Sequence, residues 1–172
     1  YEGAPRFDEL VQELRWASDW PGLGVPDLTV EFSRLRYQLT PQEVERYRLV
    51  GYHTGQAIEH AARTVRPGMS EGQIAGMIAS QALDRGITPV LLLVGVDERI
   101  HQYRHPIPTQ KELQQYAMLV ICGRRWGLVA SATRFVHFGS LPSELEHKQE
   151  ACAYVDATFN AATTTGSRVA DV

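Results

Sequence analysis

MLVICGRRWGLVASATRFVHF, residues 118–138, is the stretch that decides the fold. Two apolar runs, 118–122 and 128–138, flank the segment GRRWG at 123–127, whose glycines and polar residues are typical of a turn. The pattern therefore predicts two strands that form an antiparallel hairpin. A third run, at residues 88–96, is short and largely apolar, which suits a further buried strand.

Helices are predicted before and after these strands along the chain. Thr40-Pro41-Gln42-Glu43 combines a capping hydroxyl, a first-turn proline and a glutamate three residues after the cap, which predicts a helix from residue 41 to about 66. The same capping pattern recurs as SEGQ at 70–73 and SELE at 143–146, and it predicts helices that run to about residues 85 and 165.

The first of these helices has apolar or small residues spaced three and four apart, which predicts the face that it buries. Its two glycines are costly inside a helix and suggest a close approach to a sheet. The predicted stripe comprises Val44, Tyr47, Gly51, Gly55, Ile58, Ala62 and Val65.

Composition excludes several classes of function. The chain has 172 residues, 44% of them hydrophobic, which is enough for a sizeable core. A net charge of -3 argues against nucleic acid as the main partner, and no apolar run reaches the roughly 20 residues needed to cross a membrane. Only two cysteines are present, which favours a reducing compartment, and we expect a cytoplasmic protein.

The order of several short motifs resembles that of the pita-bread peptidases, the family of methionine aminopeptidase, aminopeptidase P, prolidase and creatinase. The resemblance covers residues 35–172 and is greatest to the aminopeptidase P, prolidase and creatinase branch. The motifs, in chain order, are TPQEVER at 40–46, VRPGMSEGQI at 65–74, HPIPT at 105–109, TRF at 133–135 and FG at 138–139.

The resemblance implies an α+β fold, in which two pseudo-symmetric halves pack helices against a curved antiparallel sheet. On that comparison residues 39–172 form the first half of the catalytic-type domain. Residues 1–38 would be the end of a preceding N-terminal domain and a linker. A homodimer is also implied.

The family uses two metal ions, held by two aspartates from this half and by a histidine and two glutamates from the other half. In this chain the two aspartate positions hold Cys122 and Ser131, and no Asp or Glu occurs anywhere in residues 114–141. A neutral thiol or hydroxyl does not balance the charge of a divalent cation as a carboxylate does. We therefore expect no metal cofactor; if a metal is bound, the resemblance implies Mn, Co or Zn. On its strand Cys122 also has a simpler interpretation, as a small core residue beside Val120 and Met118.

Two further residues match positions with a role in the family. His105 falls on the histidine that binds substrate and that, in creatinase, transfers the proton; a histidine before a proline can equally be an ordinary turn residue. Arg134 follows the threonine of the Thr-Arg step and is a candidate for substrate binding, although its side chain could instead brace the sheet.

Other candidates have weaker support. His101 and His105 are four residues apart, but Pro106 and Pro108 disfavour the helix that would bring them together on a metal. Arg124-Arg125-Trp126 could bind a phosphate or stack on a base, but it is also an ordinary hairpin turn. His137 alternates with Phe135 along its strand and is expected to be structural.

Two hypotheses about function remain. One is a hydrolase of the Xaa-Pro aminopeptidase and creatinase type, which acts on small peptides or other small C–N compounds without the usual dinuclear metal site and uses His105 to move the proton. The other is a catalytically inactive relative that acts as a binding or assembly protein.

Overall fold

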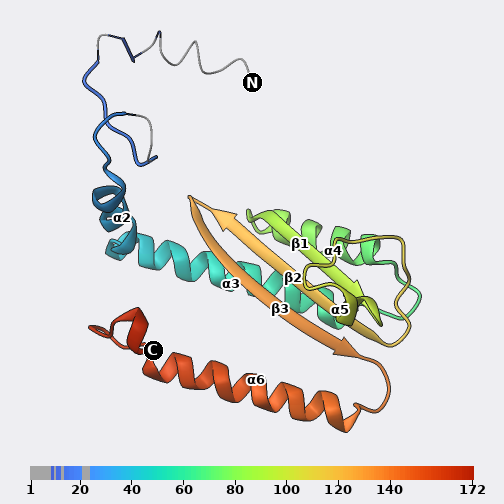
Figure 1. The fold of residues 1–172 in the computed structure, drawn as a ribbon. Coiled ribbons are helices and arrows are strands. Elements are labelled where there is room, and N and C mark those ends of the chain that lie inside the picture. Colours follow the sequence, from blue (N-terminus) through green and yellow to red (C-terminus); the bar gives the residue numbers. More distant parts are fainter. Residues whose placement is uncertain (1–8, 10, 13, 21–23) are drawn as a thin grey trace. The chain divides into compact units, whose positions relative to one another are not determined.

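A computed structural model describes residues 9, 11, 12, 14–20 and 24–172 of the chain (Figure 1). The chain divides into two compact units, Tyr1–Arg46 and Tyr47–Val172.

The first unit contains the helix α2 (Thr29–Tyr37) and the start of α3 (Pro41–Thr64). Ser18 forms a parallel bridge with Asp27, and the Arg36 guanidinium lies 3.0 Å from the Asp19 carboxylate. None of the residues of α2 is buried.

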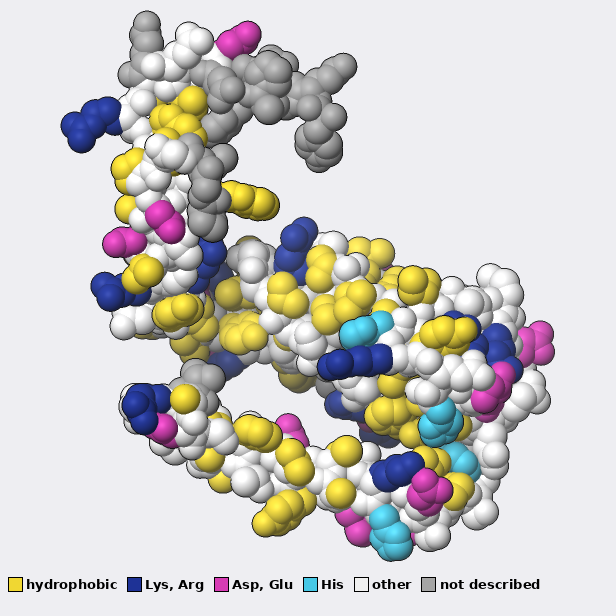
Figure 2. Space-filling view, viewed as in Figure 1, with side chains coloured by type: hydrophobic (Ala, Val, Ile, Leu, Met, Phe, Trp, Pro, Cys, Tyr) yellow, Lys and Arg dark blue, Asp and Glu magenta, His cyan; other side chains and the backbone are white. Residues whose placement is uncertain are grey.

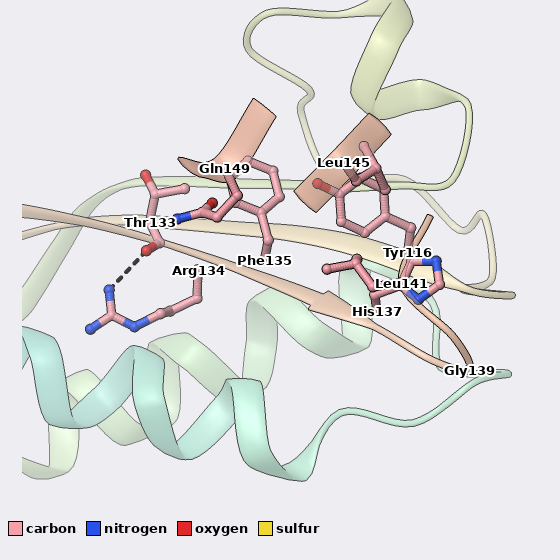
Figure 3. Close-up of a pocket in the computed structure, with 9 residues that line it drawn as sticks. All are labelled: Tyr116, Thr133, Arg134, Phe135, His137, Gly139, Leu141, Leu145 and Gln149. Carbon is pink, nitrogen blue, oxygen red and sulfur yellow. Dashed lines mark hydrogen bonds between the residues drawn. The ribbon is translucent and has the colours of Figure 1, made fainter. Parts of the chain in front are cut away.

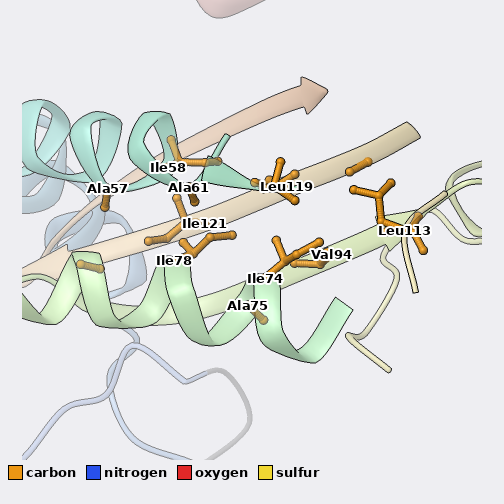
Figure 4. Close-up of a cluster of buried hydrophobic side chains, with 14 of the residues drawn as sticks. Ala57, Ile58, Ala61, Ile74, Ala75, Ile78, Val94, Leu113, Leu119 and Ile121 are labelled. Carbon is orange, nitrogen blue, oxygen red and sulfur yellow. The ribbon is translucent and has the colours of Figure 1, made fainter. Parts of the chain in front are cut away.

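The second unit holds a three-stranded antiparallel sheet in the order β1 (Thr88–Val96), β2 (Tyr116–Arg125) and β3 (Leu128–His137). The rest of α3 and the helix α4 (Glu71–Asp84) cover one face of it (Figures 1 and 4). A short helix, α5 (Arg99–Gln102), follows β1. After β3 the chain continues into α6 (Ser143–Ala162), which has no buried residue, and the 3-10 helix η1 (Val169–Asp171). The predicted strands and hairpin are confirmed.

The core lies between the sheet and the helices α3 and α4 (Figure 4). Alternate residues of β2, at positions 117, 119 and 121, point into it, as the two-residue period of a strand requires. The buried cluster comprises Val50, Ala57, Ile58, Ala61, Val65, Ile74, Ala75, Ile78, Ala82, Ile87, Val94, Val96, Leu113, Ala117, Leu119 and Ile121.

The predicted stripe of α3 is wrong over most of its length. The buried residues of α3 are Val50, Thr54, Ala57, Ile58 and Ala61, one position away from much of the predicted stripe. A Cβ at either glycine, Gly51 or Gly55, would meet no atom within 4 Å, so neither allows a close approach. Small residues, alanine and threonine, let α3 approach the sheet instead.

Two of the three predicted capping boxes are confirmed. Ser70 Oγ accepts a hydrogen bond from the Gln73 amide, and the Gln73 side chain accepts one from the Ser70 amide. Thr40 and Glu43 make the same reciprocal pair. The box at Ser143 is wrong: α6 is capped by Pro142, which makes no side-chain cap hydrogen bond, so its first turn begins at the serine rather than after it.

The hairpin turn is shorter than predicted. β2 continues to Arg125, so the connection is Trp126 and Gly127 alone, not residues 123–127. Both residues have a positive φ, 54° and 79°, as a tight two-residue turn between twisted strands requires. This turn length sets the register, in which Arg125 pairs with Leu128 and Cys122 with Ser131.

Gly123 of β2 lies where two neighbours pack closely against the sheet: Thr54 of α3 and Ile87, the residue before β1. A Cβ there would overlap Thr54 Oγ1 and would stand 2.6 Å from Cγ2 of Ile87. Any side chain at position 123 must therefore push the helix or the strand away.

We expect Gly123→Ala to lower the free energy of unfolding by about 1–3 kcal/mol, as overpacked cores do. Gly55→Ala is the matched control, because its methyl group meets open space and alanine favours a helix; it should raise stability by up to about 1 kcal/mol. Urea unfolding of both variants measures the difference. Equal effects of the two substitutions would contradict this account of Gly123.

Asp97, directly after β1, joins the end of that strand to the start of β2 by hydrogen bonds. Its carboxylate accepts hydrogen bonds from the amides of Gln114, Gln115 and Tyr116, at 2.9–3.0 Å. Burial of the carboxyl raises its pKa, but the three backbone hydrogen bonds together outweigh burial and hold the pKa of Asp97 below its ordinary value of 3.8.

Because the pKa of Asp97 is lower in the folded state than in the unfolded chain, its ionised carboxylate stabilises the fold at any pH above the pKa of the unfolded chain. That contribution should disappear as the pH falls from about 4 through the lower folded pKa. The difference in unfolding free energy between the wild type and Asp97→Asn should therefore shrink over this range. Asp84→Asn, at an exposed position on α4, controls for the loss of one negative charge. A difference that stays constant from pH 6 to pH 3 would contradict the prediction.

Candidate functional site

The sheet has a second face, which points away from α3 and α4; we call it the open face. It is formed by alternate residues of β2 and β3 that pair across the two strands. The cross-strand pairs along it are Cys122 with Ser131, Val120 with Thr133, Met118 with Phe135, and Tyr116 with His137.

Cys122 and Ser131 are brought together on this face. The Cys122 Sγ lies 3.1 Å from the Ser131 Oγ, a distance at which either group can donate a hydrogen bond to the other. Cys122 is half-buried and is not part of the core cluster, so its interpretation as a core residue is wrong. Because residues 117–122 are all apolar, their pattern did not show which face of the strand is buried.

The charge on this part of the open face is low. Neither position carries a carboxylate, and their neighbours on the face, Val120 and Thr133, have no ionisable group. Within the described residues, no group of three or more His, Cys, Asp or Glu side chains is placed to hold a metal ion.

A connection between β1 and β2 folds over one end of the open face. Gly95, which pairs with Met118, has no side chain, and a Cβ there would stand 2.8 Å from Cγ of Pro106 and 3.5 Å from Cγ1 of Ile100. Pro106 is buried at this contact, and its carbonyl accepts a hydrogen bond from the Val94 amide. His105, directly before it, is exposed.

The buried carboxylate of Glu71 holds this connection in place. Its Oε1 accepts hydrogen bonds from the Val96 amide, at 3.0 Å, and from Arg99 Nε, at 2.8 Å. Its Oε2 accepts from both the amide and the hydroxyl of Thr109. Arg99 in turn donates to the Ile107 carbonyl, so the segment that carries His105 is fixed on both sides.

Arg134 is on the opposite face of β3 from Cys122 and Ser131. Its Nε donates to Glu59 of α3 at 3.1 Å, and another guanidinium nitrogen donates to the Thr133 carbonyl (Figure 3). Hydrogen bonds from Arg134 and then from Arg63 hold the pKa of the Glu59 carboxyl below its ordinary value. This geometry supports a bracing role, and the role of Arg134 in substrate binding stays a prediction.

A pocket of about 550 Å³ opens between α6 and the end of the open face that carries Tyr116 and His137 (Figure 3). Aromatic rings of Tyr116 and Phe135 stack on one another in its wall, with centroids 5.7 Å apart and planes inclined by 25°. Leu141 and Leu145 add aliphatic surface, and Gln149 adds an amide. Figure 2 shows the hollow between α6 and the sheet, with hydrophobic side chains along it.

The remaining candidates lie apart from the Cys122 and Ser131 pair. His101 is exposed on α5 and lines an adjoining pocket, while Arg125 stacks on the Trp126 ring at 4.2 Å in the hairpin turn. The His137 ring lies 5.8 Å from that of Tyr116, and its Nδ1 is buried with no hydrogen-bond partner among the described residues.

Sequence reasoning missed Glu71 and the pair Tyr116 and Phe135. A glutamate in the first turn of a helix looks like an ordinary N-terminal charge, so nothing in the pattern distinguished Glu71. The ring pair could have been found from the turn: a two-residue connection at 126–127 places Tyr116 diagonally opposite Phe135.

We expect Glu71→Gln to lower the free energy of unfolding by about 2–4 kcal/mol, because the amide loses the charge that pairs with Arg99 and replaces an acceptor by a donor. Glu98→Gln is the control, since Glu98 is an exposed partner of Lys111 and its loss should change little. Urea unfolding with hydrogen exchange at residues 96–109 gives both stability and the protection of the His105 segment. Unchanged protection in Glu71→Gln would contradict the role assigned to Glu71.

Comparison with known proteins places these features in a family. The model of metallopeptidase family M24 matches residues 45–172. A comparison with curated protein sequences finds no match. Among solved structures, the chain is similar to the dipeptidase PepE from Mycobacterium ulcerans, with 21% identity and a TM-score of 0.67 over 75% of this chain and 36% of that one.

Two further structures show the same fold. The X-Pro aminopeptidase from Thermotoga maritima MSB8 has 17% identity and a TM-score of 0.65 over 72% of this chain and 36% of that one. The prolidase from Pyrococcus furiosus has 16% identity and a TM-score of 0.64 over 69% of this chain and 36% of that one. The chain thus spans 36% of the length of each of these relatives, as half of a pita-bread domain would. The expected fold is confirmed, and the chain belongs to metallopeptidase family M24.

Proposed function

We propose that this chain forms the first half of the substrate site of a hydrolase related to the Xaa-Pro peptidases and creatinase, and that the site works without a dinuclear metal centre. The substrate would be a small peptide or another small C–N compound, which lies along the open face. What supports the proposal is the combination of a neutral pair at Cys122 and Ser131 with a firmly held His105 segment.

The residues at the two ligand positions do not fit a pair of divalent cations. Two such ions bring four positive charges, which the carboxylates of a dinuclear site would offset. A thiol hydrogen-bonded to a hydroxyl offers no charge in its ordinary state, and the neighbouring open-face positions do not supply one. No step of the proposed reaction is therefore assigned to a metal.

His105 is the group proposed to move the proton. In hydrolysis an imidazole can accept a proton from the attacking water as the new C–O bond forms, and it can give that proton to the departing nitrogen as the C–N bond breaks. Catalysis of this kind requires a fixed geometry. The observation that carries the proposal is that a buried, fully hydrogen-bonded glutamate fixes the segment on both sides of His105, although His105 itself is exposed.

The second candidate is a catalytically silent relative that binds ligands on the open face or takes part in assembly. One observation favours it: among the described residues, the His105 ring has no hydrogen-bond partner to orient it or to select its tautomer. A general acid or base usually has such a partner, unless the substrate or another part of the protein provides one. A homodimer remains part of either proposal.

The test is hydrolysis of Xaa-Pro dipeptides and of creatine by the full-length protein, with and without added Mn²⁺ or Co²⁺. Without metal, His105→Ala should lower kcat by about 10²–10⁴-fold, the usual contribution of a positioned acid or base, while His101→Ala, also exposed on this segment, should not.

Each alternative gives a different result. Substrate binding without turnover in the wild type supports the silent relative. Activity that His105→Ala leaves unchanged removes His105 from the proposal. Tightly bound metal in a stoichiometric amount, with activity that depends on it, overturns the metal-free site.

A further inference from the structure

The pocket between the open face and α6 begins at Thr133, two residues along β3 from Ser131, and its aromatic wall lies farther along the strand. Phe135 follows Ser131 by four residues on the same strand, a distance of about 13 Å at the usual rise of a β-strand. A volume of about 550 Å³ lies within the range of small-molecule sites in proteins. The pocket therefore has the size of an independent binding site.

The wall of this pocket is suited to a flat ring. Tyr116 and Phe135 present nearly parallel ring planes, and the Phe135 side of the stack is available because Phe135 is 48% exposed. Aromatic rings prefer to add to such a pair by offset stacking or by edge contacts. Leu141 and Leu145 provide aliphatic contacts for the edges of a ring.

The polar groups of the pocket indicate a neutral ligand with hydrogen-bonding capacity. No carboxylate lines it. The guanidinium of Arg134, which does line it, pairs with Glu59 at 3.1 Å, and the ammonium group of Lys148, at the adjoining end, pairs with Glu144 at 2.7 Å. The Gln149 amide and the Thr133 hydroxyl make no hydrogen bond within the described part of the chain, and His137 Nδ1 is buried without a partner. An unsatisfied buried polar atom such as His137 Nδ1 is costly, so a ligand that pairs with it gains affinity. The Gln149 and Thr133 groups are exposed and are open to hydrogen bonds from a ligand.

We propose that this pocket binds a neutral planar ring that carries an amide or similar hydrogen-bonding group, with the ring stacked on Phe135 and Tyr116 and the polar group directed to Gln149, Thr133 or His137. The ligand is a free aromatic amide or the aromatic residue of a peptide. This site does not depend on the proposed hydrolysis.

The probes are benzamide and cyclohexanecarboxamide, which share one amide group and differ in whether the ring is flat. Calorimetric titration of the full chain should show saturable binding of benzamide, with cyclohexanecarboxamide about tenfold weaker, the size of a stacking contribution. Equal affinities would overturn the role of the ring pair. No saturable binding of benzamide would overturn the site itself.

Phe135→Ala and Phe135→Leu should each weaken benzamide binding by about tenfold, the second without opening a large space. Phe159→Ala is the matched control, because Phe159 is 53% exposed on α6 and does not line this pocket. Loss of binding in Phe159→Ala alone, or an unchanged affinity in both Phe135 variants, would overturn the assignment.

N-acetylphenylalaninamide separates the two sources of the ring. Tighter binding than benzamide supports the aromatic residue of a peptide, and weaker binding supports a free aromatic amide. Whichever result is found, the difference in affinity between the two ligands should disappear in Phe135→Leu. If the difference persists, the ring binds elsewhere.

Discussion

The two carboxylate oxygens of Glu71 accept four hydrogen bonds in the interior of the protein, and the arrangement of the domain depends on them. An unpaired charge at a fully buried position would be very costly, so the carboxylate constrains every group that pairs with it. Those groups belong to the end of β1, to α5 and to the segment before β2. One side chain at the start of α4 thereby fixes a connection that would otherwise be a long surface loop.

The two faces of the sheet carry different kinds of residues. On the helix-covered face, small residues and a glycine, such as Thr54 and Gly123, permit close packing, and Arg134 adds an ion pair to α3. On the open face the same strands carry a thiol, hydroxyls and aromatic rings at positions where the core imposes no requirement. Substitutions on the open face therefore leave the packing of the core unchanged.

Helices and strands were predicted well where the signal lies within a few neighbouring residues. The cap at Ser70 and the apolar runs of the strands depend on residues a few positions apart, and the structure confirms them. The buried stripe of α3 was not predictable in the same way, because glycine and alanine in a helix are compatible with either face. Which face of β2 is buried was equally hidden, since both faces are apolar.

The sequence by itself determined which groups residues 114–141 can offer: Cys122 and Ser131 are a thiol and a hydroxyl, and no Asp or Glu occurs in this range. Tertiary structure alone decided which groups meet. A two-residue turn pairs Cys122 with Ser131, whereas the longer turn expected from the glycines would have paired Cys122 with Leu128. The reason is physical: composition is a property of the chain, but register and burial depend on contacts between residues that are distant in sequence.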